Sequence, residues 1–196
     1  MLVGYGYPHS AGGARLGHLR PDAREAMMID FIGSRWADIA FRAYQHASLV
    51  IQAVLIATII ALAIAVLVTS YQRLAPVANG ISAVGLTIPS FALLGMLIPL
   101  VGIGTLPAII VVIFYAVLPI LRNAVVGLQS VDKSLIESAR GMGMSPAAVF
   151  FRVRLRIAWP VIMTGVRIST QMSMGVAAIA AYVLGPGLGS YIYTGL

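Results

Sequence analysis

Residues 131–160 read VDKSLIESARGMGMSPAAVFFRVRLRIAWP and form the one long polar stretch between the apolar segments of the chain. Five basic side chains lie in it, against two acidic ones. They are Lys133, Arg140, Arg152, Arg154 and Arg156, with Asp132 and Glu137. A basic stretch between hydrophobic segments is typical of a cytoplasmic loop of a membrane protein, because loop Lys and Arg residues set the orientation.

The pattern of this stretch predicts two short helices joined by a sharp turn. Asp132 or Ser134 can cap the first helix, and Ser134 with Glu137 three residues later has the spacing of a capping box. Gly141 and Gly143 end that helix, because glycine adopts positive φ at little cost. The second helix follows at once, so the stretch is a compact helix–turn–helix.

The second helix has its own start signal. Ser145 caps it, and Pro146 takes its first position, where a missing N–H costs nothing. Such a segment either orients the protein by its charge alone or docks on a partner outside the lipid.

The spacing within this stretch resembles the E-A-A-x3-G-x9-I-x-L-P signature of ABC importer permeases. In that family the loop is a coupling helix in a groove of the cytoplasmic ATPase, so the resemblance implies an ATPase-coupling loop over residues 128–157. The matching residues are Glu137, Ser138, Ala139, Gly143, Val153 and Leu155. Ser138 replaces an alanine of the signature and keeps the side chain small. Arg156 replaces its proline, and is either an interfacial anchor facing lipid phosphates or a change in the exit of the loop.

The composition is that of a membrane protein. Of 196 residues, 60% are hydrophobic and only 10% are charged, whereas about a quarter of the residues of soluble domains are charged. We therefore predict an all-α integral membrane protein, a polytopic helical bundle of the ABC importer permease type. The net charge of +7 gathers at loops, as membrane orientation requires, so no nucleic-acid partner is expected. The chain has no cysteine, which excludes disulfides and thiolate metal sites.

Residues 1–46 are predicted to be an N-terminal tail, partly disordered, with an interfacial helix over 28–45. No apolar signal region is present, and we expect translation to start at Met27 or Met28. Three scattered histidines are predicted to face solvent rather than to bind a metal. They are His9, His18 and His46.

Residues 47–196 are predicted to be the transmembrane permease domain. Four spans are expected, at 49–69, 77–101, about 106–121 (closed by Pro119) and about 158–184. The first is long enough to cross about 30 Å of hydrocarbon. Pro89 interrupts the second, which is either a kinked packing helix or a pore-lining one.

The fourth span is the most polar, which makes it the candidate to line a pathway. Arg167 lies nine residues into it, where a charge needs a partner or a wet cavity unless it extends back to the interface. Gln171 is four residues on and shares its helix face. The candidate pathway-lining residues are thus Pro89, Arg167 and Gln171.

Further motifs resemble those of osmoprotectant permeases, which import glycine betaine, carnitine or choline. They are Thr87-Ile88-Pro89-Ser90, Gly102-Ile103-Gly104, Pro119-Ile120-Leu121-Arg122-Asn123 and Gly127-Leu128-x-x-Val131-Asp132. That family has another span after this point, so the resemblance implies a fifth span, outside this sequence or supplied by a partner. The same machine with another cargo, such as methionine or a sulfonate, is the alternative, and a channel subunit is a more distant one.

The resemblance implies the partners as well: a cytoplasmic ABC ATPase dimer, a second permease subunit, identical or homologous, and an extracytoplasmic solute-binding protein, all at a membrane of lipid. No phosphate-binding P-loop motif occurs here, so we expect no enzyme activity and no directly bound cofactor, with ATP used by the partner subunit. The expected location is the inner or plasma membrane. Counting spans from a cytoplasmic coupling loop puts Arg73 inside, and the 102–105 turn and the N-terminal tail outside.

Overall fold

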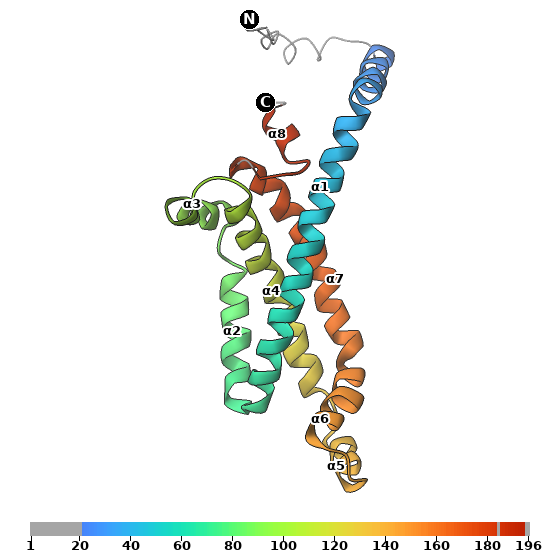
Figure 1. Ribbon diagram of the computed structural model, residues 1–196, viewed down its shortest axis with the longest axis vertical. Helices are drawn as coiled ribbons and strands as arrows, with labels where there is room; N and C mark the ends of the chain where they lie inside the picture. The colour runs from blue at the N-terminus through green and yellow to red at the C-terminus, as the bar shows by residue number, and fades with distance from the viewer. Residues whose placement is uncertain (1–20, 184, 195–196) are drawn as a thin grey trace, which may run out of the picture. The chain divides into compact units, whose positions relative to one another are not determined.

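A computed structural model describes residues 21–183 and 185–194, and all regular structure in these two ranges is helical (Figure 1). Helices are expected of apolar segments, because lipid offers the backbone no hydrogen-bond partners. The chain divides into two units, Met1–Phe41 and Arg42–Leu196. Residues 1–20 of the predicted N-terminal tail lie outside the described ranges.

The first helix, α1 (Pro21–Ser70), continues without a break from the first unit into the second. It contains both the predicted interfacial helix 28–45 and the predicted span 49–69, with no helix end at residue 46. In the second unit its buried face carries a stripe of alanines four residues apart, each at most 1% exposed. They are Ala53, Ala57, Ala61 and Ala65. Such small side chains let neighbouring helices pack closely.

The predicted span 77–101 is not one helix. After a short 3₁₀ turn, η2 (Gln72–Leu74), the chain forms α2 (Ala75–Gly85) and α3 (Ser90–Val101), which are bent by 92°. Pro89 lies at the break, with an extended ψ of 130° as the N-cap of α3. Proline disfavours helix at the residue before it and lacks the N–H that a continuing helix needs. The Tyr115 hydroxyl donates a hydrogen bond to the Ile88 carbonyl, which helps to hold this break.

The third predicted span ended too early. α4 (Thr105–Gln129) runs through Pro119, which lies inside the helix and is buried. The prediction that Pro119 closes this span at about residue 121 is therefore wrong. Transmembrane helices tolerate an internal proline where neighbouring groups satisfy the freed backbone. Beside it, the Asn123 side-chain amide donates to the Pro119 carbonyl at 2.9 Å.

The polar stretch leads directly into the last long helix. α5 (Lys133–Gly141) and α6 (Pro146–Val149) are followed by the π-helical segment η3 (Phe150–Arg154) and by α7 (Leu155–Ile179). Helix is thus continuous from Pro146 to Ile179, and Arg156 lies in the first turn of α7 rather than at the exit of a loop. A 3₁₀ turn η4 (Ala180–Val183) and the short α8 (Ser190–Thr194) complete the described chain.

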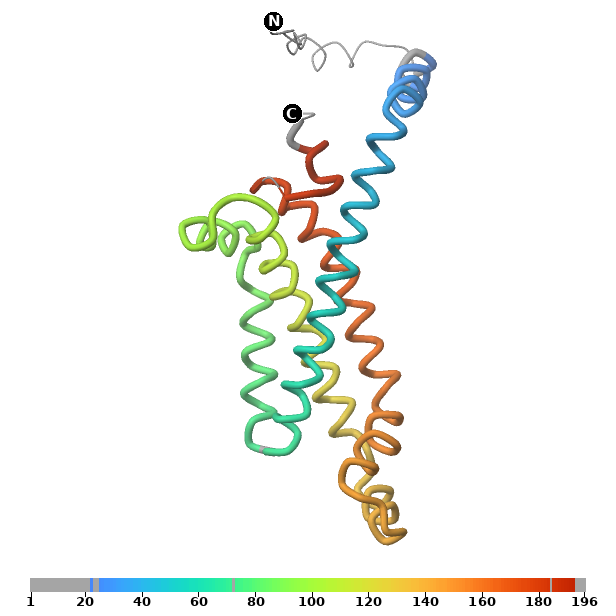
Figure 2. Tube along the Cα trace, in the orientation of Figure 1, coloured from blue at the N-terminus to red at the C-terminus, as the bar shows by residue number. Residues whose placement is uncertain are grey.

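α4 and α7 lie side by side, with α5 and α6 beyond their shared end (Figures 1 and 2). Gly165 of α7 lies so close to α4 that an added Cβ would come within 2.7 Å of the Asn123 Cβ and 3.0 Å of the Pro119 carbonyl oxygen. One turn further along, the buried Ser169 hydroxyl donates to the Ala116 carbonyl at 2.7 Å. The absence of a side chain at Gly165 and the buried hydrogen bond from Ser169 to Ala116 therefore determine how closely α7 approaches α4.

Among the described helices, two are long and apolar enough to cross a membrane: α1, over Glu25–Ser70, and α4. The bent pair of α2 and α3 makes a third if it counts as one span. α7 has 25 residues, but its polar side chains keep it out of this set. By length and composition alone, two or three spans are recognised among the described helices, and the predicted count of four stays a prediction.

Gly165→Ala should lower the thermal unfolding midpoint of the detergent-solubilised protein. The new methyl group would overlap α4, at a cost of about 1–3 kcal/mol. Gly175→Ala is the matched control, because it lies on the same helix with nothing within 4 Å of its added Cβ. The control should be neutral or stabilising, since alanine favours helix over glycine. Equal midpoints for the two variants would contradict the close α4–α7 contact.

Candidate coupling segment and translocation face

The first turn of α5 is capped by one of the two predicted residues. The Asp132 carboxylate accepts a hydrogen bond from the Ser134 backbone N–H at 2.9 Å. Ser134 itself lies inside α5, so the predicted capping box with Glu137 does not form. Hydrogen bonds from the Ser134 backbone and side chain hold the pKa of the Asp132 carboxyl below its ordinary value. The carboxylate thus favours the folded turn above the ordinary pKa, and this contribution is lost as pH falls through the lowered value.

The turn after α5 is closed by backbone hydrogen bonds and one glycine. Gly143 has φ +83°, as predicted, and its N–H donates to the Arg140 carbonyl at 2.9 Å. The Met144 N–H donates to the Ala139 carbonyl at 3.2 Å. α6 then begins as predicted, with the Ser145 hydroxyl accepting from the Ala148 N–H at 3.3 Å and Pro146 in first position.

The predicted coupling residues divide between the coupling segment, which comprises α5, α6 and the turn between them, and the helix that follows it. Ala139 is 2% exposed and forms the packed base of the coupling segment. Glu137, Ser138 and Gly143 are exposed, whereas Val153 of η3 and Leu155 at the start of α7 are half-buried. The structure therefore brings the first four together around one turn and leaves the last two further along the chain.

Two apolar side chains on this segment were missed by the sequence analysis. Leu135 is 47% exposed and Met142 is 75% exposed, although both lie in a polar stretch. Exposed apolar groups beside a charged helix are typical of a docking surface. Their type and position were visible in the sequence, but their exposure was not.

α7 presents two different faces. Gly165, Ser169 and Ser173 are buried on one of them, and the first two contact α4. The predicted pathway residues Arg167 and Gln171 are exposed, four residues apart on another face. Pro89 is exposed as well but lies elsewhere, at the break between α2 and α3. The structure thus groups two of the three candidates on one helix face.

His46 does not face solvent, which corrects the prediction for this residue. It is 4% exposed, and its Nε2 lies 3.1 Å from the Met174 carbonyl oxygen. Gly187, with φ +121°, packs so closely on the ring that an added Cβ would lie 2.7 Å from Nδ1. Sequence analysis missed this contact because it joins residues far apart in the chain. His9 and His18 lie outside the described residues.

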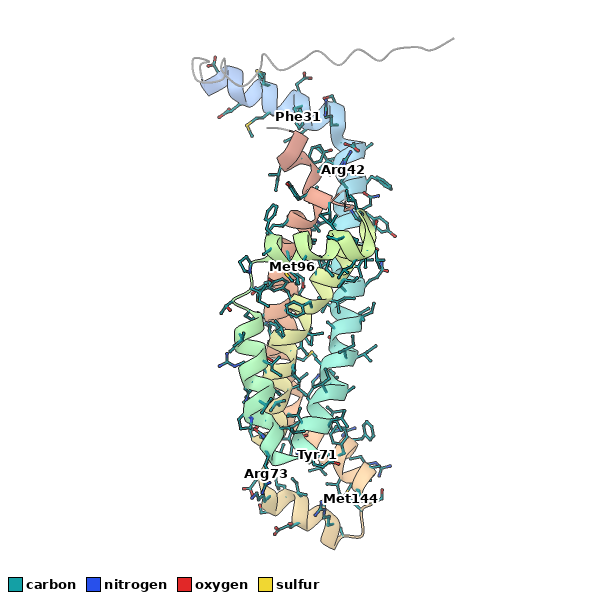
Figure 3. The ribbon with its side chains drawn as sticks, turned by 90° about the vertical axis from the view of Figure 1, so that its left-hand side faces the viewer. Phe31, Arg42, Tyr71, Arg73, Met96 and Met144 are labelled. Carbon is teal, nitrogen blue, oxygen red and sulfur yellow. The ribbon has the colours of Figure 1, made fainter. Side chains whose placement is uncertain are left out.

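Arg42 makes a second connection to the end of the described chain. Its Nη1 donates to the Ser190 hydroxyl at 2.6 Å, and its guanidinium lies 5.2 Å from the centre of the Tyr191 ring. Arg42 lies at one end of the second unit, and Arg73 and Met144 lie at the other (Figure 3). Arg73 and the coupling segment therefore share one end, as the span count requires.

These features can now be set beside known proteins. Residues 71–196 match the family described as binding-protein-dependent transport system inner membrane component. The chain belongs to this family. The chain is 39% identical over 169 residues to the choline transport system permease protein OpuBB of Bacillus subtilis, a match that covers 86% of this chain and 78% of that relative.

Other relatives of the chain confirm the predicted resemblance to osmoprotectant permeases. The carnitine transport permease protein OpuCB of Listeria monocytogenes is 37% identical over the same shares of the two chains. The osmoprotectant import permease protein OsmW of Salmonella typhimurium is 40% identical over 163 residues, with 81% of this chain and 76% of that relative covered. Among solved structures, an inward-facing MetNI methionine ABC transporter is similar, with a TM-score of 0.67, 26% identity and 79% of each chain covered.

Replacing Asp132 with alanine should speed amide hydrogen exchange in the first turn of α5. The Ser134 N–H would lose its acceptor, and an uncapped helix start frays more often. Ser134→Ala should have a smaller effect, because it keeps the backbone N–H that donates to the Asp132 carboxylate and removes only the side-chain hydrogen bond. Peptide-level hydrogen exchange on the purified protein measures both. Equal exchange in the wild type and in Asp132→Ala would show that the Asp132 cap does not stabilise this turn.

Proposed function

We propose that this chain is the membrane-spanning subunit of an ATP-driven importer for osmoprotectants such as glycine betaine, carnitine or choline. The observation that carries the proposal is the 37–40% identity to permeases named for choline, carnitine and osmoprotectant transport, over more than three quarters of each relative. The methionine transporter is less similar, at 26% identity. That match supports a shared fold more than a shared cargo.

In the proposed arrangement the chain crosses the membrane four times: by α1, by the bent pair of α2 and α3, by α4 and by α7. α7 has 25 residues, a length of roughly 37 Å as a helix, and it packs along α4, which is apolar enough to span. Its exposed Arg167 and Gln171 would be costly against lipid. We therefore assign this face to a wet translocation path, bordered by the second permease subunit.

The coupling segment is the proposed contact with the ATPase dimer. Leu135 and Met142 offer apolar surface for a groove of the partner, and Ala139 anchors the segment below them. This end of the chain is assigned to the cytoplasm, and the solute-binding protein to the opposite end. ATP is hydrolysed by the partner subunits, and the spans then rock between inward and outward states.

Uptake by reconstituted vesicles tests the function directly. The full transporter, with its ATPase and binding protein, should accumulate radiolabelled choline or glycine betaine only when ATP is supplied. Methionine is the matched control cargo, and it should not be accumulated. Uptake of methionine alone would assign the chain to the alternative cargo, and flux without ATP would make it a channel.

Gly143→Val should reduce ATP-dependent uptake while the transporter still assembles in the membrane. A β-branched residue at φ +83° is strained by about 1–3 kcal/mol, so the turn of the coupling segment would change shape. Gly141→Val is the control, because Gly141 ends α5 without a positive φ and with open space around it. Normal uptake by Gly143→Val would show that the conformation of this turn is not needed to couple transport to ATP hydrolysis.

Cysteine at position 171 should react with water-soluble thiol reagents in at least one transport state. The chain has no native cysteine, so the labelling reports on one site alone. Ser173→Cys is the control on the same helix, since Ser173 is fully buried and should remain unlabelled. If residue 171 is inert both with and without ATP, its face lies against lipid or protein.

A further inference from the structure

A cavity of about 790 Å³ lies where the coupling segment meets the ends of α1 and α4. Its lining has two kinds of wall. Apolar side chains such as Val66 of α1, Leu128 of α4 and Phe150 of η3 form one part. The charged side chains of the other part are Lys133, Glu137, Arg140 and Arg154. The cavity is therefore amphipathic, and its four charged side chains all belong to the polar stretch of the sequence.

The charges of the cavity favour an anion. Three basic side chains face one carboxylate, that of Glu137, so the lining has an excess of positive charge even if Glu137 neutralises one cation. A concave site lined by one sign of charge concentrates ions of the opposite sign. The exposed Arg152 and Arg156 are outside the lining. Only three of the five basic residues of the polar stretch therefore line the cavity.

Arg154 lines this cavity and carries a side-chain donor without a partner. Its Nη2 donates to the Leu128 carbonyl at 3.2 Å, which fixes the guanidinium at the end of α4. Its Nε is buried and has no hydrogen-bond partner, and a buried donor without an acceptor is unfavourable. Guanidinium groups bind phosphate oxygens through two parallel N–H groups. The side chain comes from a π-helical segment, a form often found at functional sites.

We infer that this cavity binds the phosphate group of an anionic phospholipid. The last turns of α1 and α4, the two helices with the composition of membrane spans, both line this cavity, through Val66, Thr69 and Ser70 and through Leu128 and Gln129. The cavity therefore lies where lipid chains give way to headgroups. Basic pockets at this depth bind anionic headgroups, and the apolar wall accommodates the first part of the acyl chains. A free phosphate ion would contact only the basic part of the lining.

A headgroup in this position links elements that move together in the proposed transport function. Lys133 and Arg140 belong to α5, whereas Arg154 lies on the helix that leads into α7. One phosphate between them would join the coupling segment to the membrane helices. The site rests on the membrane-spanning role of the chain and not on the identity of its cargo.

Lipid binding to the purified full chain in detergent tests this inference. The probes are phosphatidylglycerol and phosphatidylcholine with identical acyl chains, and inorganic phosphate, with bound ligand counted by native mass spectrometry. Phosphatidylglycerol should bind more tightly than phosphatidylcholine. Arg154→Gln and Lys133→Gln should each weaken phosphatidylglycerol binding about fivefold, the loss expected for one basic residue near a charged headgroup.

Arg152→Gln is the matched control, two residues from Arg154 but outside the cavity, and should leave the affinity unchanged. Lys133 is exposed, so Lys133→Gln gives an answer even if Arg154→Gln fails to fold. Equal losses for Arg152→Gln and Lys133→Gln would mean that general surface charge attracts the lipid, and the site would be wrong. Inorganic phosphate that binds as tightly as phosphatidylglycerol would overturn the assignment to lipid. Because the readout is binding, a failure of transport would not affect it.

Discussion

The close approach of α7 to α4 at Gly165 is the contact on which the rest of the second unit depends. α4 is the most buried of the long helices in the described chain, and α2 and α3 also pack against it. The coupling segment connects the ends of α4 and α7. Its position therefore depends on how these two helix ends are held relative to each other. A glycine at this crossing therefore has effects beyond its own neighbours, since a larger residue would separate the two helices that hold the segment.

The distribution of polar groups on α7 follows from this packing. The face toward α4 uses small residues, and the Ser169 hydroxyl finds a carbonyl there. Arg167 and Gln171 cannot enter so close a contact and lie on another face. A helix of this kind is too polar to be identified as a span by composition. In the proposed arrangement it crosses the membrane beside its apolar partner α4.

Features set by local sequence were predictable, and features set by tertiary contacts were not. Ser145, Pro146 and Gly143 act through the backbone within a few residues, and their roles in the turn were predicted correctly. Pro89 was expected to disturb a helix, but the 92° bend depends on what surrounds it. Pro119 has the same chemistry and lies inside a continuous helix. The burial of His46 depends on Met174 and Gly187, more than a hundred residues away along the chain, and no local pattern encodes it.

The uninterrupted helix from Pro146 to Ile179 makes one mechanical body of the second half of the coupling segment and the last long helix. Because no loop lies between α6 and α7, a displacement of α6 is transmitted to α7 as a tilt or an axial rotation. The π-helical segment Phe150–Arg154 and Pro160 inside α7 both interrupt the regular α-helical hydrogen bonding, so twist can be taken up at either place. A small rotation of the helix before Arg167 would move Arg167 and Gln171 together, because both lie further along α7.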